Sequence, residues 1–272
     1  MRLALAQLDI EPNQPATNRQ RAVAAIQDAA AKGADLVALP EIFTVGYFSF
    51  DAYADAAEAL DGPTTTLLSE QASEHDIAVL AGTFVEDLAA SATRGFETPA
   101  PEGYANTAVF LDRNGNRQAV YRKHHLFGYD SAETELLTPG ETLPTVLFEG
   151  FTIGITTCYD LRFPELYRHL QEQGTTLILV PSAWPYPRVE HWEVLTQARA
   201  IENLSYVGAV NGAGSFADAT LLGRSAIYDP WGTKLAGAGD DSALIVADVD
   251  PAVVSGVREE FPALSDKRDL YH

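Results

Sequence analysis

The amino-acid sequence predicts an α/β protein in which two pseudo-symmetric halves form a four-layer α-β-β-α sandwich. Strand-like and helix-like segments alternate along the chain, and both halves have the order β-α-β-α-β-β-β. A short stretch is repeated, because residues 33–40 and 174–181 each run from a glycine through an apolar segment to a proline. Since no linker separates the halves, we expect one domain over residues 1–272.

The first half is expected to begin with a buried strand and to end with a hairpin. Gly33 is placed to end the first helix, Pro40 stops the second strand, and Asn114-Gly115 has the sequence of a tight turn. Residues 87–103 are rich in Ala, Thr, Pro and Gly and are predicted to form a loop. The predicted strands are 3–9, 35–40, 77–85, 107–111 and 119–122, and the predicted helices are 18–31 and 63–75.

The second half repeats this order. Gly174 is placed to end its first helix, and Pro181 stops its second strand. Helices that connect parallel strands imply right-handed crossovers, which cover one face of each sheet and leave the other faces to pack together. The predicted strands are 151–157, 176–181, 205–210, 225–228 and 233–236, and the predicted helices are 164–173 and 190–203.

The composition excludes several classes of partner. Hydrophobic residues make up 46% of the chain, which is ample for a core. The net charge of −20 and the pI of about 4.5 argue against binding to nucleic acid or to anionic membranes. No apolar run approaches the length of a membrane span. The single cysteine permits no internal disulfide, so we expect a reducing, cytoplasmic location.

Three reactive side chains follow predicted strands. Glu41, Lys123 and Cys158 each come directly after such a strand, where ligand sites of α/β sheets gather, so the three can share one cleft. We expect helix-terminal N–H groups near Cys158 to favour its thiolate. Lysine is rare in this chain, which has four lysines and fourteen arginines. The presence of Lys123 directly after Arg122 suggests a role that needs a compact ammonium and that arginine cannot fill. Taken alone, each also has a non-catalytic explanation: Cys158 as a core thiol, Glu41 as a solvated loop carboxylate and Lys123 as a surface lysine.

Seven short motifs follow one another in a fixed order. They are Leu39-Pro-Glu-Ile-Phe43, Tyr121-Arg-Lys-His-His-Leu-Phe127, Leu137-Thr-Pro-Gly140, Thr157-Cys-Tyr-Asp-Leu-Arg-Phe-Pro-Glu165, His191-Trp192, Ala198-Arg-Ala-Ile-Glu-Asn203 and Asp229-Pro-Trp-Gly232. In this order they resemble the carbon–nitrogen hydrolase (nitrilase) family over essentially the whole chain. The resemblance implies an αββα sandwich and a Glu–Lys–Cys triad, which maps onto Glu41, Lys123 and Cys158. A further family glutamate maps onto Glu133, with Glu135 as the alternative.

These residue types suit amide hydrolysis. A thiolate is an effective nucleophile toward an amide carbonyl at neutral pH. Glu41 is expected to take the thiol proton and to deliver it to the departing ammonia. Lys123 and the backbone N–H of Tyr159 are expected to stabilise the oxyanion, while Glu133 orients Lys123 and the substrate. We expect no metal and no organic cofactor.

Within the resemblance, the segments around Cys158, Arg188 and His191 are most similar to the omega-amidase branch, whose substrates are small dicarboxylate monoamides. An arginine can bind the carboxylate of such a substrate through two parallel hydrogen bonds, and Arg188 is our candidate for this role. We expect aromatic side chains to line a small pocket, namely Tyr47, Phe48 and Trp184. The alternatives are nitrilase, deaminated-glutathione amidase and N-carbamoyl amidohydrolase activity on the same triad.

Two other hypotheses use the same sequence differently. A Cys–His hydrolase would recruit one of His124, His125, His169 and His191, but ordinary polar roles account for them, and the six histidines lack metal-ligand spacing. A scaffold or regulatory subunit would need none of the four candidate catalytic residues. Fast reaction of the thiol with iodoacetamide near neutral pH would distinguish an enzyme from an inert module.

Two expectations concern the protein in solution. The resemblance implies a homodimer or higher homo-oligomer, associated through the helix after Cys158 and the helix around Arg199, with the tail at 261–271 lying across a neighbour. The acidic residues, 38 against 18 basic ones, repel one another unless salt screens them, which suggests a salt-rich, halophilic cytoplasm. A high-GC genome that favours Ala, Arg and Asp is the alternative explanation.

Overall fold

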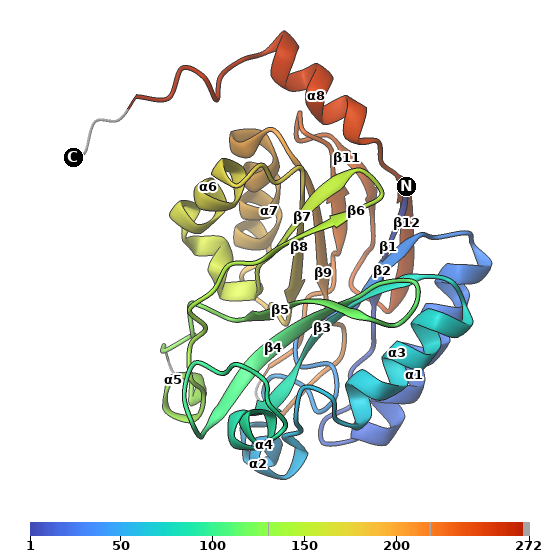
Figure 1. Cartoon of the computed structure of the whole chain (residues 1–272), viewed down its shortest axis with the longest axis vertical. Coiled ribbons are helices and arrows are strands. Elements are labelled where there is room, and N and C mark those ends of the chain that lie inside the picture. Colours follow the sequence, from blue (N-terminus) through green and yellow to red (C-terminus); the bar gives the residue numbers. More distant parts are fainter. Residues whose placement is uncertain (130, 218, 269–272) are drawn as a thin grey trace.

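The computed structural model describes residues 1–129, 131–217 and 219–268. Two six-stranded sheets lie face to face, with α1 and α3 outside the first and α6 and α7 outside the second (Figure 1). The four-layer α-β-β-α sandwich predicted from the sequence is therefore confirmed. Among the described residues, no helix has the length and apolar character needed to cross a membrane.

The first sheet has the strand order β12-β1-β2-β3-β4-β5. Strands β1, β2 and β3 are parallel, and the other pairs are antiparallel. Its strands are β1 (Arg2–Gln7), β2 (Leu36–Ala38), β3 (Ala78–Asp87), β4 (Tyr104–Leu111), β5 (Arg117–Arg122) and β12 (Ala243–Asp248). All but β12 were predicted. The chain returns from the second half to place β12 beside β1, so the first sheet contains one strand from the C-terminal part of the chain.

The second sheet has the corresponding order β11-β10-β9-β8-β7-β6. Its parallel strands β7, β8 and β9 match β1, β2 and β3, and β6 occupies the edge that β12 occupies in the first sheet. Its strands are β6 (Thr145–Phe148), β7 (Phe151–Ile155), β8 (Leu177–Ser182), β9 (Tyr206–Asn211), β10 (Ala226–Tyr228) and β11 (Lys234–Gly237). Strand β6 was not predicted.

The covering helices agree with the prediction, with shifts of a few residues at their ends. They are α1 (Pro15–Ala31), α3 (Pro63–Glu74), α6 (Pro164–Glu172) and α7 (Val189–Asn203). Three of these four begin with proline, which suits the first turn because its missing N–H would be unpaired there. The remaining helices are η1 (Phe50–Ala52), α2 (Tyr53–Ala56), α4 (Leu88–Thr93), α5 (Glu133–Leu136), η2 (Cys158–Arg162) and α8 (Pro251–Glu260).

The predicted loop at 87–103 is wrong in its first part, which forms α4. Asp87 caps this helix by accepting a hydrogen bond from the Ala90 N–H at 2.9 Å. The alanines that follow have high helix propensity, so a cap and a short run suffice once β3 holds the preceding residue.

Close approach of the two sheets depends on small residues at their contact. A Cβ added at Gly208 of β9 would lie 3.0 Å from Leu179 and 3.1 Å from Leu3, on strands of both sheets. At Gly82 of β3 it would lie 2.4 Å from Pro181. The second contact is between β3 and the end of β8. It brings the carboxyl ends of strands from the two halves close together.

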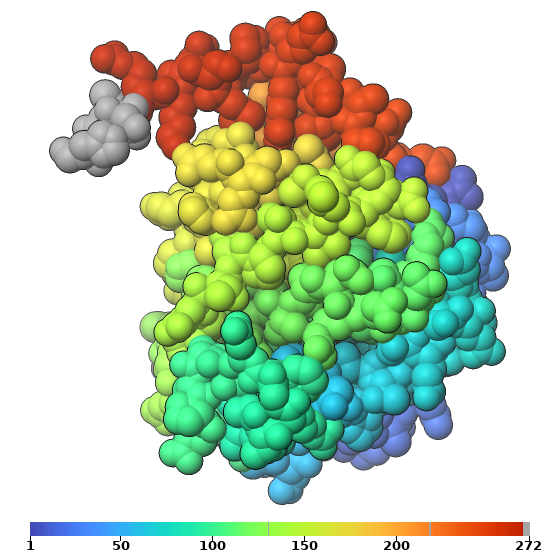
Figure 2. Space-filling view, viewed as in Figure 1, coloured from blue at the N-terminus to red at the C-terminus, as the bar shows by residue number. Residues whose placement is uncertain are grey.

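Beyond α8 the chain leaves the body of the molecule (Figure 2). Residues 261–268 form no helix or strand and are exposed except for Leu264. Lys267 forms an ion pair with Glu172 of α6. The last residues of the tail that was predicted to lie across a neighbour, 269–271, are outside the described part of the chain.

Candidate active site

Glu41, Lys123 and Cys158 come together where the carboxyl ends of β2, β5 and β7 meet. Glu41 and Lys123 are almost completely buried, and Cys158 is 9% exposed. Glu41 and Lys123 belong to the first half, whereas Cys158 opens η2 in the second half. The sandwich therefore assembles residues that are far apart in sequence, as predicted.

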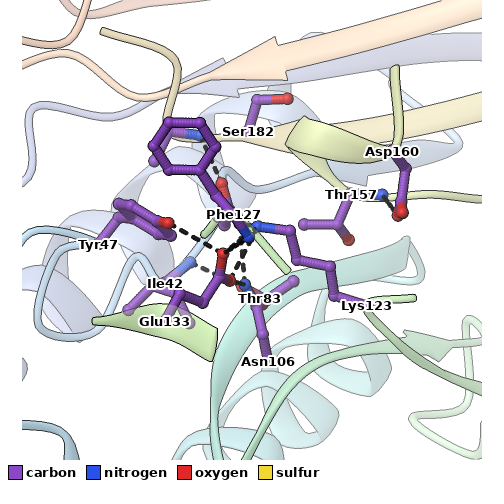
Figure 3. A network of polar contacts seen from close by, with 12 residues as sticks. Ile42, Tyr47, Thr83, Asn106, Lys123, Phe127, Glu133, Thr157, Asp160 and Ser182 are labelled. Carbon is purple, nitrogen blue, oxygen red and sulfur yellow. Dashed lines mark hydrogen bonds and ion pairs between the residues drawn. The ribbon is translucent and has the colours of Figure 1, made fainter. Parts of the chain in front are cut away.

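Lys123 lies between two carboxylates (Figure 3). Its Nζ donates to Glu41 Oε1 at 2.9 Å and to Glu133 Oε1 and Oε2 at 2.8 and 3.0 Å. The ring of Tyr47 lies 5.2 Å from the ammonium. Of the two candidate glutamates, the structure places Glu133 at the ammonium and Glu135 on the surface.

Both buried carboxylates are also fixed by neutral donors. The backbone N–H of Ala183 donates to Glu41 Oε2 at 2.9 Å. Glu133 Oε2 accepts from the Tyr47 hydroxyl at 2.9 Å and from the backbone N–H of Phe127 at 2.7 Å. Charge-assisted hydrogen bonds of this kind hold a buried ion in one geometry and offset part of its desolvation.

Asn106 is a residue of this network that sequence reasoning missed. It lies on β4, and its Nδ2 donates to Glu41 Oε1 at 2.8 Å and to Glu133 Oε1 at 3.3 Å. The only available signal was a polar residue just before a predicted strand at 107–111. Its Oδ1 is buried and has no hydrogen-bond partner among the described residues.

Two residues at the site have left-handed backbone conformations that non-glycine residues seldom adopt. The φ angle is +47° at Cys158 and +43° at Ile42, directly after Glu41. The Ile42 N–H donates to Thr83 Oγ1 at 2.7 Å, which helps to hold the second of these turns. Such conformations persist only where surrounding contacts enforce them, and they concentrate at functional sites.

The electrostatics favour a protonated thiol in the resting protein. Burial raises the pKa of Cys158 well above its usual value, and the Glu41 carboxylate adds to this effect. The prediction that helix N–H groups favour the thiolate is therefore wrong for the resting protein, because desolvation and the neighbouring carboxylate outweigh them. Burial raises the pKa of Glu41 as well, against the opposing effect of Lys123. Burial also opposes the charge on Lys123, but Glu133 and Glu41 hold its pKa well above the usual range.

The thiol and the ammonium border a cavity of about 200 Å³. All four predicted substrate-binding residues, Tyr47, Tyr159, Trp184 and Arg188, line it. The other predicted aromatic residue, Phe48, lines it as well. The sequence did not single out the remaining large lining side chains, which are Phe127, Tyr129, Arg162 and Tyr186.

Besides Lys123, two arginines place positive charge at this largely aromatic cavity. Arg188 lies over the Phe127 ring at 5.9 Å, and Arg162 lies over Trp184 at 5.1 Å. The Arg162 guanidinium also contacts His191 Nδ1 at 3.1 Å. Among the described residues, no carboxylate lies within 4.0 Å of either guanidinium. The position of Arg162 at the cavity was not predicted, since the sequence showed it only as part of the motif around Cys158.

The histidines lie outside this arrangement. His125 pairs with Asp160 at 2.7 Å, His124 stacks on Tyr121, and neither lines the cavity. Within the described chain, no group of three or more His, Cys, Asp or Glu side chains is placed to hold a metal ion. The geometry thus offers Glu41 and Lys123, and no histidine, as the partners of the thiol.

The chain has similar proteins along its whole length. The family model for carbon-nitrogen hydrolase matches residues 2–259. The 2-oxoglutaramate amidase of Paenarthrobacter nicotinovorans is 38% identical over 240 residues, which cover 86% of this chain and 79% of that protein. The deaminated glutathione amidase of Synechocystis sp. is 35% identical over 274 residues and covers 97% of both. A crystal structure of a Saccharomyces cerevisiae member of branch 10 of the nitrilase superfamily has a TM-score of 0.87, with 29% identity and coverage of 100% of this chain and 97% of that one.

Proposed function

Because the chain belongs to the carbon–nitrogen hydrolase family and is thus a hydrolase of carbon–nitrogen bonds other than peptide bonds, we propose that it releases ammonia from a small amide bearing a carboxylate. The observation that carries this proposal is the junction of a thiol, an ammonium and two arginines in one cavity of about 200 Å³. The model substrate is 2-oxoglutaramate, which agrees with the name of the Paenarthrobacter relative.

In the proposed first half-reaction, Glu41 takes the proton of the Cys158 thiol as sulfur attacks the amide carbonyl carbon. Burial raises the pKa of Glu41, which makes this carboxylate a stronger base and offsets part of the raised pKa of the Cys158 thiol. The carbonyl π pair moves to oxygen, where the ammonium of Lys123 and the N–H of Tyr159 stabilise the negative charge. As the carbon–nitrogen bond breaks, Glu41 gives its proton to nitrogen, and ammonia leaves from a thioester.

In the second half-reaction, water attacks the thioester with Glu41 again acting as base. The carbon–sulfur bond breaks, the proton returns to sulfur, and the carboxylic acid leaves. Glu133 and Asn106 touch Lys123 or Glu41 and are proposed to hold them in position throughout. No step of this scheme requires a cofactor.

We propose that Arg188 binds the substrate carboxylate, with Arg162 contributing to the same positive region. The net charge of the chain is −20, so a cavity with two arginines stands out from the rest of the surface and would attract an anion. Guanidinium groups pair with carboxylates in a bidentate manner, which fixes orientation as well as affinity.

The remaining hydrolase activities are alternatives for the same site. Deaminated glutathione amidase activity is favoured by the Synechocystis relative, but a cavity of about 200 Å³ suits a smaller amide better. Ammonia release from 2-oxoglutaramate, deaminated glutathione, a nitrile and an N-carbamoyl amino acid will decide among them. We expect the highest kcat/KM for 2-oxoglutaramate, and absence of activity toward it would contradict the proposal.

Arg188→Gln tests the recognition of the carboxylate. We expect KM for 2-oxoglutaramate to rise about tenfold or more, because a hydrogen-bonded charge pair is lost. A neutral amide of the same length is the matched control, since its KM should change little. Equal changes for both substrates would contradict a role for Arg188 in carboxylate binding.

We propose that the two halves act as one cytoplasmic domain. Glu41 and Lys123 come from one half and Cys158 from the other, and β12 completes the sheet of the first half. The buried thiol is the only cysteine, which suits a reducing compartment.

We further propose a homodimer formed through α6 and α7. On α7, Val194 is 61% exposed and Ile201 is 48% exposed. The rings of Trp231 and Phe261, which lie 5.9 Å from each other, are on residues that are 47% and 50% exposed. We expect light scattering at micromolar concentration to give twice the 29.4 kDa of one chain. Val194→Asp should weaken the dimer, whereas Leu147→Asp on β6, which is 84% exposed, should not. A wild-type monomer would refute the proposal.

We also propose that the acidic surface is an adaptation to salt. Net self-repulsion destabilises a compact fold at low ionic strength, and the Debye length falls from about 10 Å at 0.1 M to about 3 Å at 1 M. We therefore expect Tm to rise steeply as potassium chloride increases toward molar concentration. Sucrose at equal osmolality is the control for solute exclusion, and a flat or falling Tm would mean that the acidity is a compositional accident.

A further inference from the structure

Asp160 is a completely buried carboxylate that the proposed reaction does not use. It lies two residues after Cys158, within η2, and four donors surround it. Oδ1 accepts from the His125 backbone N–H at 3.0 Å and faces His125 Nδ1 at 2.7 Å. Oδ2 accepts from the Tyr121 hydroxyl at 2.5 Å. It also accepts from the Thr157 backbone N–H at 2.8 Å (Figure 3).

These partners flank two of the three reactive residues. Tyr121 and His125 lie two positions before and two positions after Lys123, and Thr157 directly precedes Cys158. One carboxylate therefore connects the chain around the ammonium, in the first half, to the chain around the thiol, in the second. Cys158 has a φ of +47°, a conformation that requires such external support.

We propose that Asp160 is a positioning residue that sets the geometry of Cys158 relative to Lys123. This inference rests on the proposed function, in which sulfur attacks a carbonyl whose oxygen moves toward Lys123. Displacement of reacting groups by about 1 Å can cost roughly 10²-fold in rate, so the link between the two segments matters for the chemical step. It matters less for binding of the substrate carboxylate, because Arg188, the proposed carboxylate-binding residue, lies on another segment, just before α7.

Asp160→Asn is a sharp test because every group around the carboxylate can donate. Whichever way the amide is turned, its NH2 must face either the Thr157 N–H or the His125 N–H, and that backbone donor loses its partner. The Tyr121 hydroxyl and the His125 ring can reverse their roles, but a backbone N–H cannot. The substitution preserves the shape of the side chain, replaces one acceptor oxygen by an NH2 group and removes the negative charge.

We expect Asp160→Asn to lower kcat by about 10- to 100-fold, with KM changed by less than about threefold. The pH profile of Cys158 alkylation by iodoacetamide should also shift to lower pH, because a relaxed turn exposes the thiol and reduces the burial that raises its pKa. Loss of stability alone would not move this profile in the folded protein. Tyr121→Phe, which removes one donor, should lower kcat by a smaller factor.

Asp35→Asn is the matched control. Asp35 also accepts from a backbone N–H and a side chain, namely Arg2 and Arg113, but it lies before β2, at the opposite end of the sheet from Glu41. We expect it to lower Tm without changing kcat or the alkylation profile. Unchanged kcat and alkylation in Asp160→Asn would overturn the proposal, as would equal effects of Asp35→Asn.

The outcomes also separate this inference from the proposed function. If the wild-type protein hydrolyses no amide, the proposed function fails, and the alkylation profiles still show whether Asp160 controls the thiol. If Asp160→Asn does not fold, Tyr121→Phe decides, and a kcat and alkylation profile equal to wild type in that variant would overturn the inference.

Discussion

Replacing Cys158 with alanine is expected to abolish ammonia release while the protein stays folded. Removal of the nucleophile from an enzyme that forms a covalent intermediate costs on the order of 10⁶-fold in kcat. The cost to stability should be small, because the side chain is short, borders the cavity and forms no disulfide. The measurements are ammonia release from 2-oxoglutaramate and thermal unfolding.

Cys158→Ser is the companion variant, since it keeps an O–H where the thiol was. A serine hydroxyl ionises far less readily than a thiol, so Glu41 should not activate it, and this variant should also be nearly inactive. Unaltered ammonia release by either folded variant would rule out a thioester intermediate. If Cys158→Ala loses both its activity and its folded state, the loss of activity says nothing about the thiol. Cys158→Ser then provides the test, because serine keeps the shape of the cysteine side chain.

The alternation of strands and helices was predictable because it is encoded locally. The strands β1–β3 and β7–β9 of the parallel core are apolar, and glycine or proline marks several of their ends. The sequence therefore predicted the boundaries of these strands to within a few residues. Two of the four edge strands, β6 and β12, were not predictable in this way. Strand β6 has only four residues, and β12 is defined by its pairing with β1, in which Arg2 lies opposite Asp248. Pairing across nearly the whole chain leaves no local pattern.

The site shows the same division. Glu41, Lys123, Glu133 and Cys158 were proposed from strand ends and motifs, and the structure brings them together. Asn106 was missed because a single polar residue at the start of a strand has many explanations. The direction of the Cys158 pKa shift was also missed, because it depends on burial and on the distance to Glu41, which only the packed sandwich determines.

The buried charges make Lys123 the most demanding position in the site. Two carboxylates converge on its Nζ within 3.0 Å, and the side chain is 1% exposed. Lys123→Ala would leave Glu41 and Glu133 facing each other without a cation, which costs about 3–5 kcal/mol in typical buried pairs unless a proton binds. Its effect on activity therefore combines lost oxyanion stabilisation with a disturbed base.

Lys123→Arg separates geometry from charge. Arginine keeps the cation, but its planar guanidinium is larger than an ammonium and cannot direct donors tetrahedrally toward both carboxylates and an oxyanion. We expect kcat/KM to fall roughly 10²-fold or more, nearly as far as in Lys123→Ala, because an oxyanion donor is lost in both. Lys32→Arg, at an exposed lysine, is the control and should have wild-type activity.

The comparison of the two Lys123 variants decides what the residue contributes. If charge alone were needed, arginine would restore most of the activity that alanine loses, and a rate within about threefold of wild type would show this. If the compact ammonium is needed, arginine should recover part of the Tm lost in Lys123→Ala, since it still neutralises Glu41 and Glu133, but little of the kcat. Steady-state kinetics and thermal unfolding of the same three proteins therefore distinguish a structural cation from one that stabilises the oxyanion.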